Sequence, residues 1–119
     1  GTLLNDYHVE VGKLMEKELI GLGLITPQDV ANQSPELPAY KKYFMHGTSH
    51  FLGLDVHDVG SWENPIEAGM VFTCEPGIYI PEENLGIRLE NDILVTEYGP
   101  KDLMANIPLE ADEIEALMA

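Results

Sequence analysis

The chain has 119 residues, a formal net charge of −15 at pH 7 and 45% hydrophobic residues. This length and composition are typical of one globular domain with a modest core. The acidic charge excludes nucleic acid and anionic membranes as partners, because both are bound through basic patches, and no apolar run is long enough to span a bilayer. A single cysteine, Cys74, cannot form an internal disulfide, which predicts a reducing compartment and a cytoplasmic location.

Two helices are predicted in the first third of the chain. Apolar residues recur at helical spacing between residues 3 and 24, with charged residues mostly on the other side, and two glycines end the pattern. The sequence TPQD at 26–29 places a capping residue before a proline and an aspartate, so a short helix should run to about Asn32. The stretch QSPELPAYKK at 33–42 contains two prolines and is expected to be a loop.

The rest of the chain has the pattern of strands followed by one helix. Residues 70–75 and 77–80 are rich in β-branched and aromatic residues, and residues 86–99 alternate before ending in turn residues. The tail at 108–118 is expected to form an amphipathic helix with acidic residues in its first turn. The order of elements predicts an α+β domain.

Three of the four histidines, His46, His50 and His57, lie within HGTSHFLGLDVHDVG at 46–60. The zinc-protease helix pattern does not apply, because no glutamate follows the first histidine. In an extended segment His46 and His50 share one face, and His57 needs a turn near Gly53 to join them. The pattern alone leaves two interpretations open, namely polar loop residues or a metal or peptide site.

Two glutamates downstream favour the second interpretation. Glu75 ends an apolar strand and is held extended by Pro76, and Arg88 and Glu90 share one strand face. Taken singly, each glutamate is more simply explained by a structural role, such as a surface ion pair of little energy. Together with His50, the two glutamates form an imidazole and carboxylate set that suits Mn, Co or Zn.

Three motifs, in this order, resemble the C-terminal half of the catalytic domain of the Xaa-Pro aminopeptidase and prolidase family, which has the pita-bread fold. They are HGTSHFLGLDVHDVG at 46–60, GMVFTCEPGIYI at 69–80 and GIRLENDILVT at 86–96. The resemblance covers residues 1–119 and implies an antiparallel sheet with helices packed on one face. It also implies a metal-dependent exopeptidase that hydrolyses the N-terminal Xaa-Pro bond of a peptide through a metal-bridging hydroxide. The family uses two divalent ions, for which we expect Mn, with Co or Zn as alternatives.

The resemblance assigns roles residue by residue. The family's metal ligands match three residues: His50, Glu75 and Glu90. Glu75 also matches the general base and acid. The histidines that bind substrate and stabilise the tetrahedral intermediate match His46 and His57, and the supporting hydrogen-bond network matches Tyr79 and Arg88.

The chain departs from the family at the first two metal ligands, which are aspartates on a strand hairpin in the preceding half of the domain. Asp6 and Asp29 lie in helical contexts and do not match them. We therefore expect a fragment of a longer peptidase, inactive alone and binding at most one metal ion weakly. The alternatives are a dipeptidase of the prolidase type and a non-catalytic binding module. An isolated half would expose a sheet edge and an apolar face, which predicts a homodimer.

Overall fold

The computed structural model describes all of residues 1–119 and confirms the two predicted N-terminal helices. Helix α1 (Leu4–Gly21) is followed by Gly23, whose φ of 73° turns the chain, and by the short helix α2 (Pro27–Ala31). Thr26 and Asp29 form a capping box at the start of α2, as the TPQD sequence predicts. None of the helices is both long and apolar enough to cross a bilayer.

The predicted loop at 33–42 contains a 3₁₀ helix, η1 (Ala39–Lys42), which packs against α1. A Cβ at Gly12 of α1 would lie 2.6 Å from the Tyr40 hydroxyl, so glycine permits this close approach. The centre of the core is formed by Leu19, Ile25 and Tyr43 and lies at the C-terminal end of α1.

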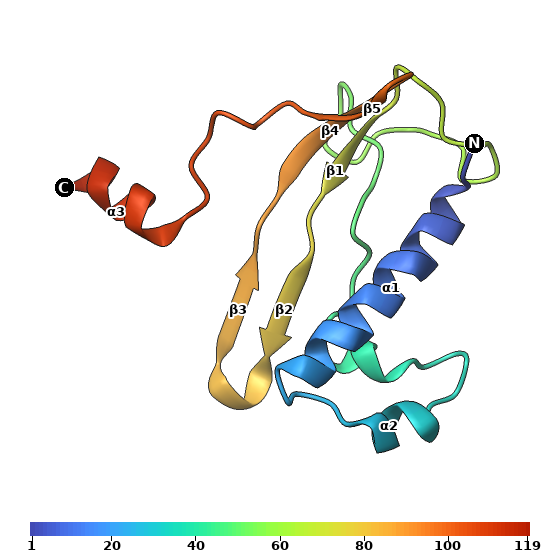
Figure 1. Cartoon of the computed structure of the whole chain (residues 1–119). Helices are drawn as coiled ribbons and strands as arrows, with labels where there is room; N and C mark the ends of the chain where they lie inside the picture. The colour runs from blue at the N-terminus through green and yellow to red at the C-terminus, as the bar shows by residue number, and fades with distance from the viewer.

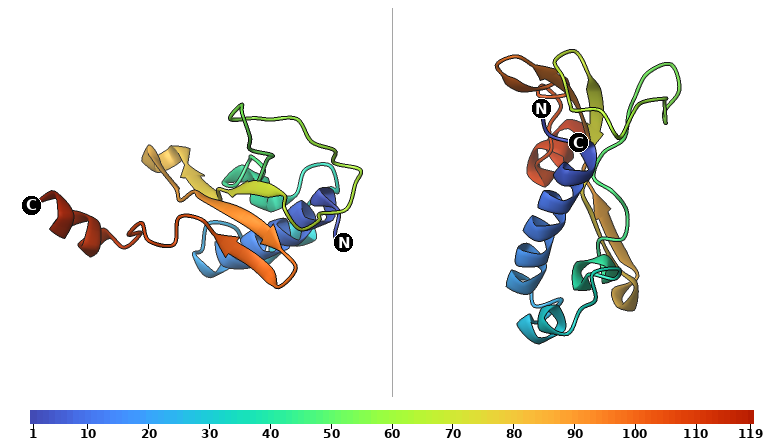
Figure 2. Two further views of the ribbon diagram at one scale, coloured as in Figure 1. Left: turned by 90° about the horizontal axis from the view of Figure 1, so that it is seen from above. Right: turned by 90° about the vertical axis from the view of Figure 1, so that its right-hand side faces the viewer.

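Five strands form two antiparallel sheets that follow one another along one long ribbon (Figure 1). They are β1 (Val71–Cys74), β2 (Gly77–Ile80), β3 (Leu85–Arg88), β4 (Asn91–Thr96) and β5 (Gly99–Asp102). The ribbon comprises a sheet of order β1-β4-β5 and the hairpin β2-β3, whose turn holds a second 3₁₀ helix, η2 (Pro81–Glu83). Figure 2 shows α1 on one side of the ribbon, with the segment that follows residue 50 projecting as a loop on the other.

The ladder hydrogen bonding is interrupted at one level of the ribbon, between β1 and β2 on one side and between β3 and β4 on the other. The last pair of the first sheet is Cys74 with Asn91, and the first pair of the hairpin is Gly77 with Arg88. Glu75 and Pro76 therefore lie opposite Leu89 and Glu90 without ladder pairing. A proline has no N–H to donate to a ladder, which explains one side of the interruption.

Three details differ from the sequence prediction. The single run expected at 86–99 is divided into β3 and β4, and β5 was not predicted, because its sequence, GPKD, has neither β-branched residues nor an apolar face. The tail helix α3 (Ala111–Met118) is present but has no buried residue and projects away from the ribbon (Figure 1).

Candidate metal centre

The HGTSH segment is extended and runs alongside β1. The Glu75 N–H donates to the Thr48 carbonyl at 2.7 Å, and the Thr73 N–H donates to the His50 carbonyl at 3.1 Å. The His50 N–H in turn donates to Oγ1 of Thr73 at 3.1 Å. These backbone bonds confirm the extended interpretation of the segment. They bring His50 beside Glu75, although the two residues belong to different motifs.

In its neutral form, the imidazole of His50 presents a lone pair to the carboxylate of Glu75. Nδ1 of His50 lies 2.8 Å from the Phe51 carbonyl oxygen, which only accepts hydrogen bonds, so Nδ1 carries the proton of the neutral ring. Nε2 lies 3.1 Å from Oε1 of Glu75, with the two side chains only 19% and 12% exposed. Two acceptor atoms therefore face the same point, an arrangement that a cation or an added proton stabilises.

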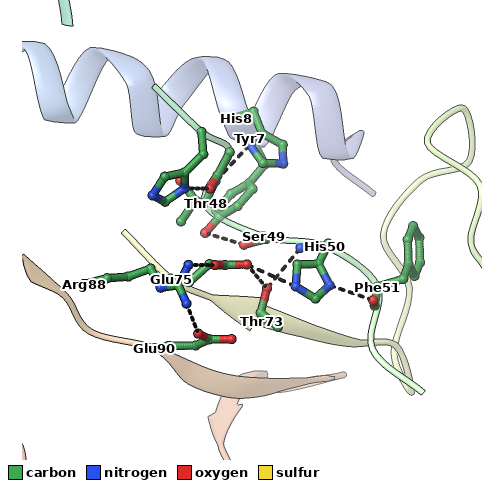
Figure 3. Close-up of polar contacts among 12 residues, drawn as sticks. Tyr7, His8, Thr48, Ser49, His50, Phe51, Thr73, Glu75, Arg88 and Glu90 are labelled. Carbon is green, nitrogen blue, oxygen red and sulfur yellow. Dashed lines mark hydrogen bonds and ion pairs between the residues drawn. The ribbon is translucent and has the colours of Figure 1, made fainter. Parts of the chain in front are cut away.

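Arg88 contacts the carboxylates of both glutamates (Figure 3). Its Nη1 lies 3.3 Å from Oε2 of Glu75, and its Nη2 lies 3.4 Å from Oε2 of Glu90. The Thr73 hydroxyl donates to Oε1 of Glu75 at 3.1 Å. Arg88 is the only arginine of the chain, and its planar fork lets one side chain orient both carboxylates.

The chemistry of this group fits a divalent metal ion. One ligand atom each from His50, Glu75 and Glu90 lies within 4.8 Å of the others. An imidazole and two carboxylates are suitable ligands for borderline or hard divalent ions. The proton of His50 is committed to a backbone carbonyl, as is usual for a metal-ligating histidine. The structure thus brings together the three residues predicted as ligands, while their role in binding metal stays a prediction.

The other two histidines of the motif, His46 and His57, have different neighbours. The His57 ring lies beside the His50 ring, with centroids 4.3 Å apart and an interplanar angle of 48°, so the chain does turn back after Gly53. His46 lies against β2, where its Nε2 is 3.1 Å from the Tyr79 hydroxyl and its Nδ1 is 2.7 Å from the Gly47 carbonyl. In the neutral ring, Nδ1 donates to that carbonyl, so Nε2 accepts from the Tyr79 hydroxyl.

Three residues that support the predicted metal ligands were not identified from the sequence, namely Thr73, Tyr7 and His8. Thr73 could have been found, because it lies two residues before Glu75 and shares its strand face. Tyr7 and His8 on α1 contact the segment through Ser49 and Thr48, and no local pattern signals this. Burial raises the pKa of Tyr7, an effect that its hydrogen bond with Ser49 opposes.

The profile of metallopeptidase family M24 matches residues 1–97, which is most of the chain. The chain belongs to this family. Its membership confirms the predicted resemblance and implies divalent metal ions as cofactors. The M24 chain is 40% identical over 130 residues to the Xaa-Pro aminopeptidase of Haemophilus influenzae and 41% identical over 130 residues to that of Escherichia coli.

These alignments cover 99% of the M24 chain but only 30% and 29% of the two relatives, so the chain spans about a third or less of their length. Solved structures agree. Zn-substituted E. coli aminopeptidase P in complex with product matches with a TM-score of 0.80 and 41% identity, over 99% of this chain and 29% of that one. Proline aminopeptidase P II from Yersinia pestis matches with a TM-score of 0.79 and 40% identity, over 99% and 30%. The predicted class, a part of the pita-bread fold, is confirmed.

Proposed function

We propose that this chain supplies part of the active site of a metal-dependent exopeptidase that hydrolyses the N-terminal Xaa-Pro bond of peptides. The observation that carries the proposal is the convergence of His50, Glu75 and Glu90 within 4.8 Å at the interruption of the strand ribbon. The names of the relatives support the substrate class, because both curated proteins are Xaa-Pro aminopeptidases.

The position of each residue in the site indicates its proposed role. His50, Glu75 and Glu90 would hold the metal, and Arg88 and Thr73 orient the carboxylates. When bound, the metal supplies Lewis acidity and lowers the pKa of coordinated water. Oε2 of Glu75 is paired with Arg88, whereas Oε1 faces His50 and accepts from the uncharged Thr73 hydroxyl, so we assign Oε1 as the atom that takes up and returns a proton.

His46 and His57 are proposed to bind the peptide. The His57 ring lies beside the metal ligand His50, and the His46 ring is held by Tyr79. Nε2 of His46 accepts from the Tyr79 hydroxyl, which fixes the ring and assigns Tyr79 a supporting role. The proposed substrate is a peptide with proline at its second position.

Mn is the metal that we propose, with Co or Zn as alternatives. Two carboxylates to one imidazole favour a harder ion than a thiolate or all-histidine site would. Three ligands from one chain leave much of a coordination shell to water, so we expect this chain alone to bind at most one ion, and weakly. The unpaired Cys74 supports a reducing location, for which we propose the cytoplasm.

A second copy of the chain is the proposed partner at the hairpin. Strand β3 pairs only with β2, all four of its residues are exposed, and the exposed fractions of Leu85 and Ile87 are 45% and 61%. An apolar groove between the hairpin and Met15 of α1 is lined in part by Leu85 and Ile87 of this strand. Edge pairing about a twofold axis would satisfy the free N–H and C=O groups and cover the groove in both copies.

A chimera tests the proposed activity directly. The matching segment of E. coli Xaa-Pro aminopeptidase is replaced by residues 1–119, and release of the first residue from a tripeptide with proline second is measured with Mn²⁺. We expect turnover by the chimera, none by the isolated chain, and loss of turnover in a Glu75→Gln chimera but not in a Glu97→Gln chimera, because Glu97 is exposed on a turn. Full turnover with Glu75→Gln would overturn the assignment.

The same chimera separates the alternatives. Cleavage of an Xaa-Pro dipeptide with no cleavage of the tripeptide would favour a prolidase. A folded chimera that binds peptide but cleaves neither substrate would favour a binding module.

A further inference from the structure

The fourth histidine, His8, lies between α1 and the HGTSH segment, outside the metal centre (Figure 3). It projects from α1, and its ring stacks on Trp62 with centroids 5.4 Å apart and an interplanar angle of 21°. Its Cε1 approaches Gly47 so closely that a Cβ there would lie 2.8 Å away. Nδ1 accepts a hydrogen bond from the Thr48 N–H at 3.4 Å. His8 therefore contacts the segment that carries His50 from the side opposite the metal ligands.

The tautomer of His8 follows from this bond. Nδ1 accepts from a backbone N–H, so the proton of the neutral ring is on Nε2, and Nε2 is buried with no hydrogen-bond partner. A buried N–H without a partner is costly, and phenylalanine would fill the same space and stack on Trp62 without that cost. What histidine adds at this position is the acceptor at Nδ1. Burial lowers the pKa of His8, with only partial opposition from the backbone of Ser49, so the ring keeps its acceptor near neutral pH.

The peptide groups around Thr48 link this acceptor to the ligands. The Thr48 N–H is bound by His8, and the Thr48 carbonyl accepts from the Glu75 N–H at 2.7 Å. Thr48 itself is only 2% exposed. Two residues further on is His50, whose Nε2 faces Oε1 of Glu75. The position of Thr48 therefore sets the spacing between one predicted metal ligand and the strand that carries the other.

We propose that His8 is a positioning residue for the metal centre. Its Nδ1 fixes the Thr48 peptide from the α1 side and so aims His50 and Glu75 at one point. This inference rests on the proposed metal-binding function of these two ligands.

Two variants separate an acceptor role from a packing role. His8→Phe keeps the ring and its stack on Trp62 but removes the acceptor, whereas His8→Asn loses the ring and keeps an acceptor at the position of Nδ1. Mn²⁺ affinity is measured by calorimetry and the exchange rate of the Thr48 amide by NMR. We expect His8→Phe to bind Mn²⁺ about fivefold more weakly and to exchange Thr48 faster, as expected for loss of one hydrogen bond. His8→Asn should stay close to the wild type in both.

The outcomes distinguish the two proposals. A packing role predicts the reverse order, with His8→Phe like the wild type and His8→Asn impaired, and that result would overturn the inference. Absence of Mn²⁺ binding by the wild type would refute the metal centre, and the Thr48 exchange rates would still decide whether His8 anchors the segment. If a variant does not fold, ¹⁵N NMR of the wild-type imidazole decides: a proton on Nδ1 of His8 contradicts the inference, and a proton on Nε2 supports it.

Discussion

Nε2 of His50 lies 3.1 Å from Oε1 of Glu75, and both atoms are hydrogen-bond acceptors in the neutral imidazole and the carboxylate. The pair comes from two different motifs, joined by backbone bonds between the HGTSH segment and β1. A proton or a metal ion relieves the repulsion between them. Because Glu90 contributes a third oxygen at the same place, a divalent ion satisfies more of these acceptors than one proton can.

Replacing Arg88 by lysine should weaken metal binding although the charge is kept. A lysine ammonium is a point charge and cannot contact Glu75 and Glu90 with two separate N–H groups. We expect the Mn²⁺ dissociation constant to rise about tenfold, the usual effect of losing a group that orients the ligands. Calorimetry on Arg88→Lys measures this change, and Lys101→Arg on β5 is the control. An unchanged affinity in Arg88→Lys would show that the guanidinium does not orient the carboxylates.

Gly47→Ala should destabilise the fold through a clash with His8. The new Cβ would lie 2.8 Å from Cε1 and 3.2 Å from Nδ1 of His8. We expect a loss of about 1–3 kcal/mol in the free energy of unfolding, measured in urea. Gly21→Ala is the control, because a Cβ there meets nothing within 4 Å.

The clash also predicts that substitutions at His8 and Gly47 have coupled effects on stability. In a His8→Ala background the added methyl group has room, so Gly47→Ala should cost clearly less there than in the wild type. Equal costs in both backgrounds would mean that His8 and Gly47 do not touch in solution.

The stability of the chain should fall at acidic pH in a manner that depends on His8. Burial lowers the pKa of His8 below its ordinary value of 6.5, so the unfolded chain binds the proton more readily than the folded chain. Stability contributed by the neutral ring is therefore complete above about pH 6.5 and is lost as the pH falls below that value.

Thermal unfolding between pH 5 and 8 measures this effect by comparing the wild type with His8→Phe. The titratable groups around the His8 ring are Tyr7 on α1, Tyr40 and Lys41 in η1, and His46, and all four remain in the variant. The difference in Tm between the two proteins should therefore change with pH only below about 6.5. A difference that is constant from pH 5 to 8 contradicts the assigned shift.

Self-association should depend on the free edge of the hairpin. Ile87 on β3 is 61% exposed, and a lysine there places charge on the predicted interface. We expect light scattering at micromolar concentration to show a dimer for the wild type and a monomer for Ile87→Lys. Tyr98→Lys, at a turn where Tyr98 is 98% exposed, should remain a dimer. Added salt should strengthen the dimer by screening the net charge of −15, and a monomeric wild type would overturn the proposal.

The sequence predicts the metal ligands better than the surrounding contacts that hold them in place. The convergence of His50, Glu75 and Glu90 is expected from the family resemblance of the motifs that carry them, because the sequence pattern alone leaves structural roles open. The interruption between Arg88 and Asn91 could not be expected, because neither a proline nor a glycine marks it on this strand. The contact of His8 with Thr48 joins residues far apart in the chain, and only the packing of α1 against the segment creates it.

The most direct test of the metal centre is calorimetric titration of the chain with Mn²⁺ near pH 7.5, beside the variants Glu75→Gln and Glu97→Gln. The structure predicts one weak site in the wild type and in Glu97→Gln, and at least about tenfold weaker binding in Glu75→Gln, which loses a charged ligand. No binding heat in the wild type, or equal binding by Glu75→Gln, would contradict the assignment of His50, Glu75 and Glu90 as metal ligands.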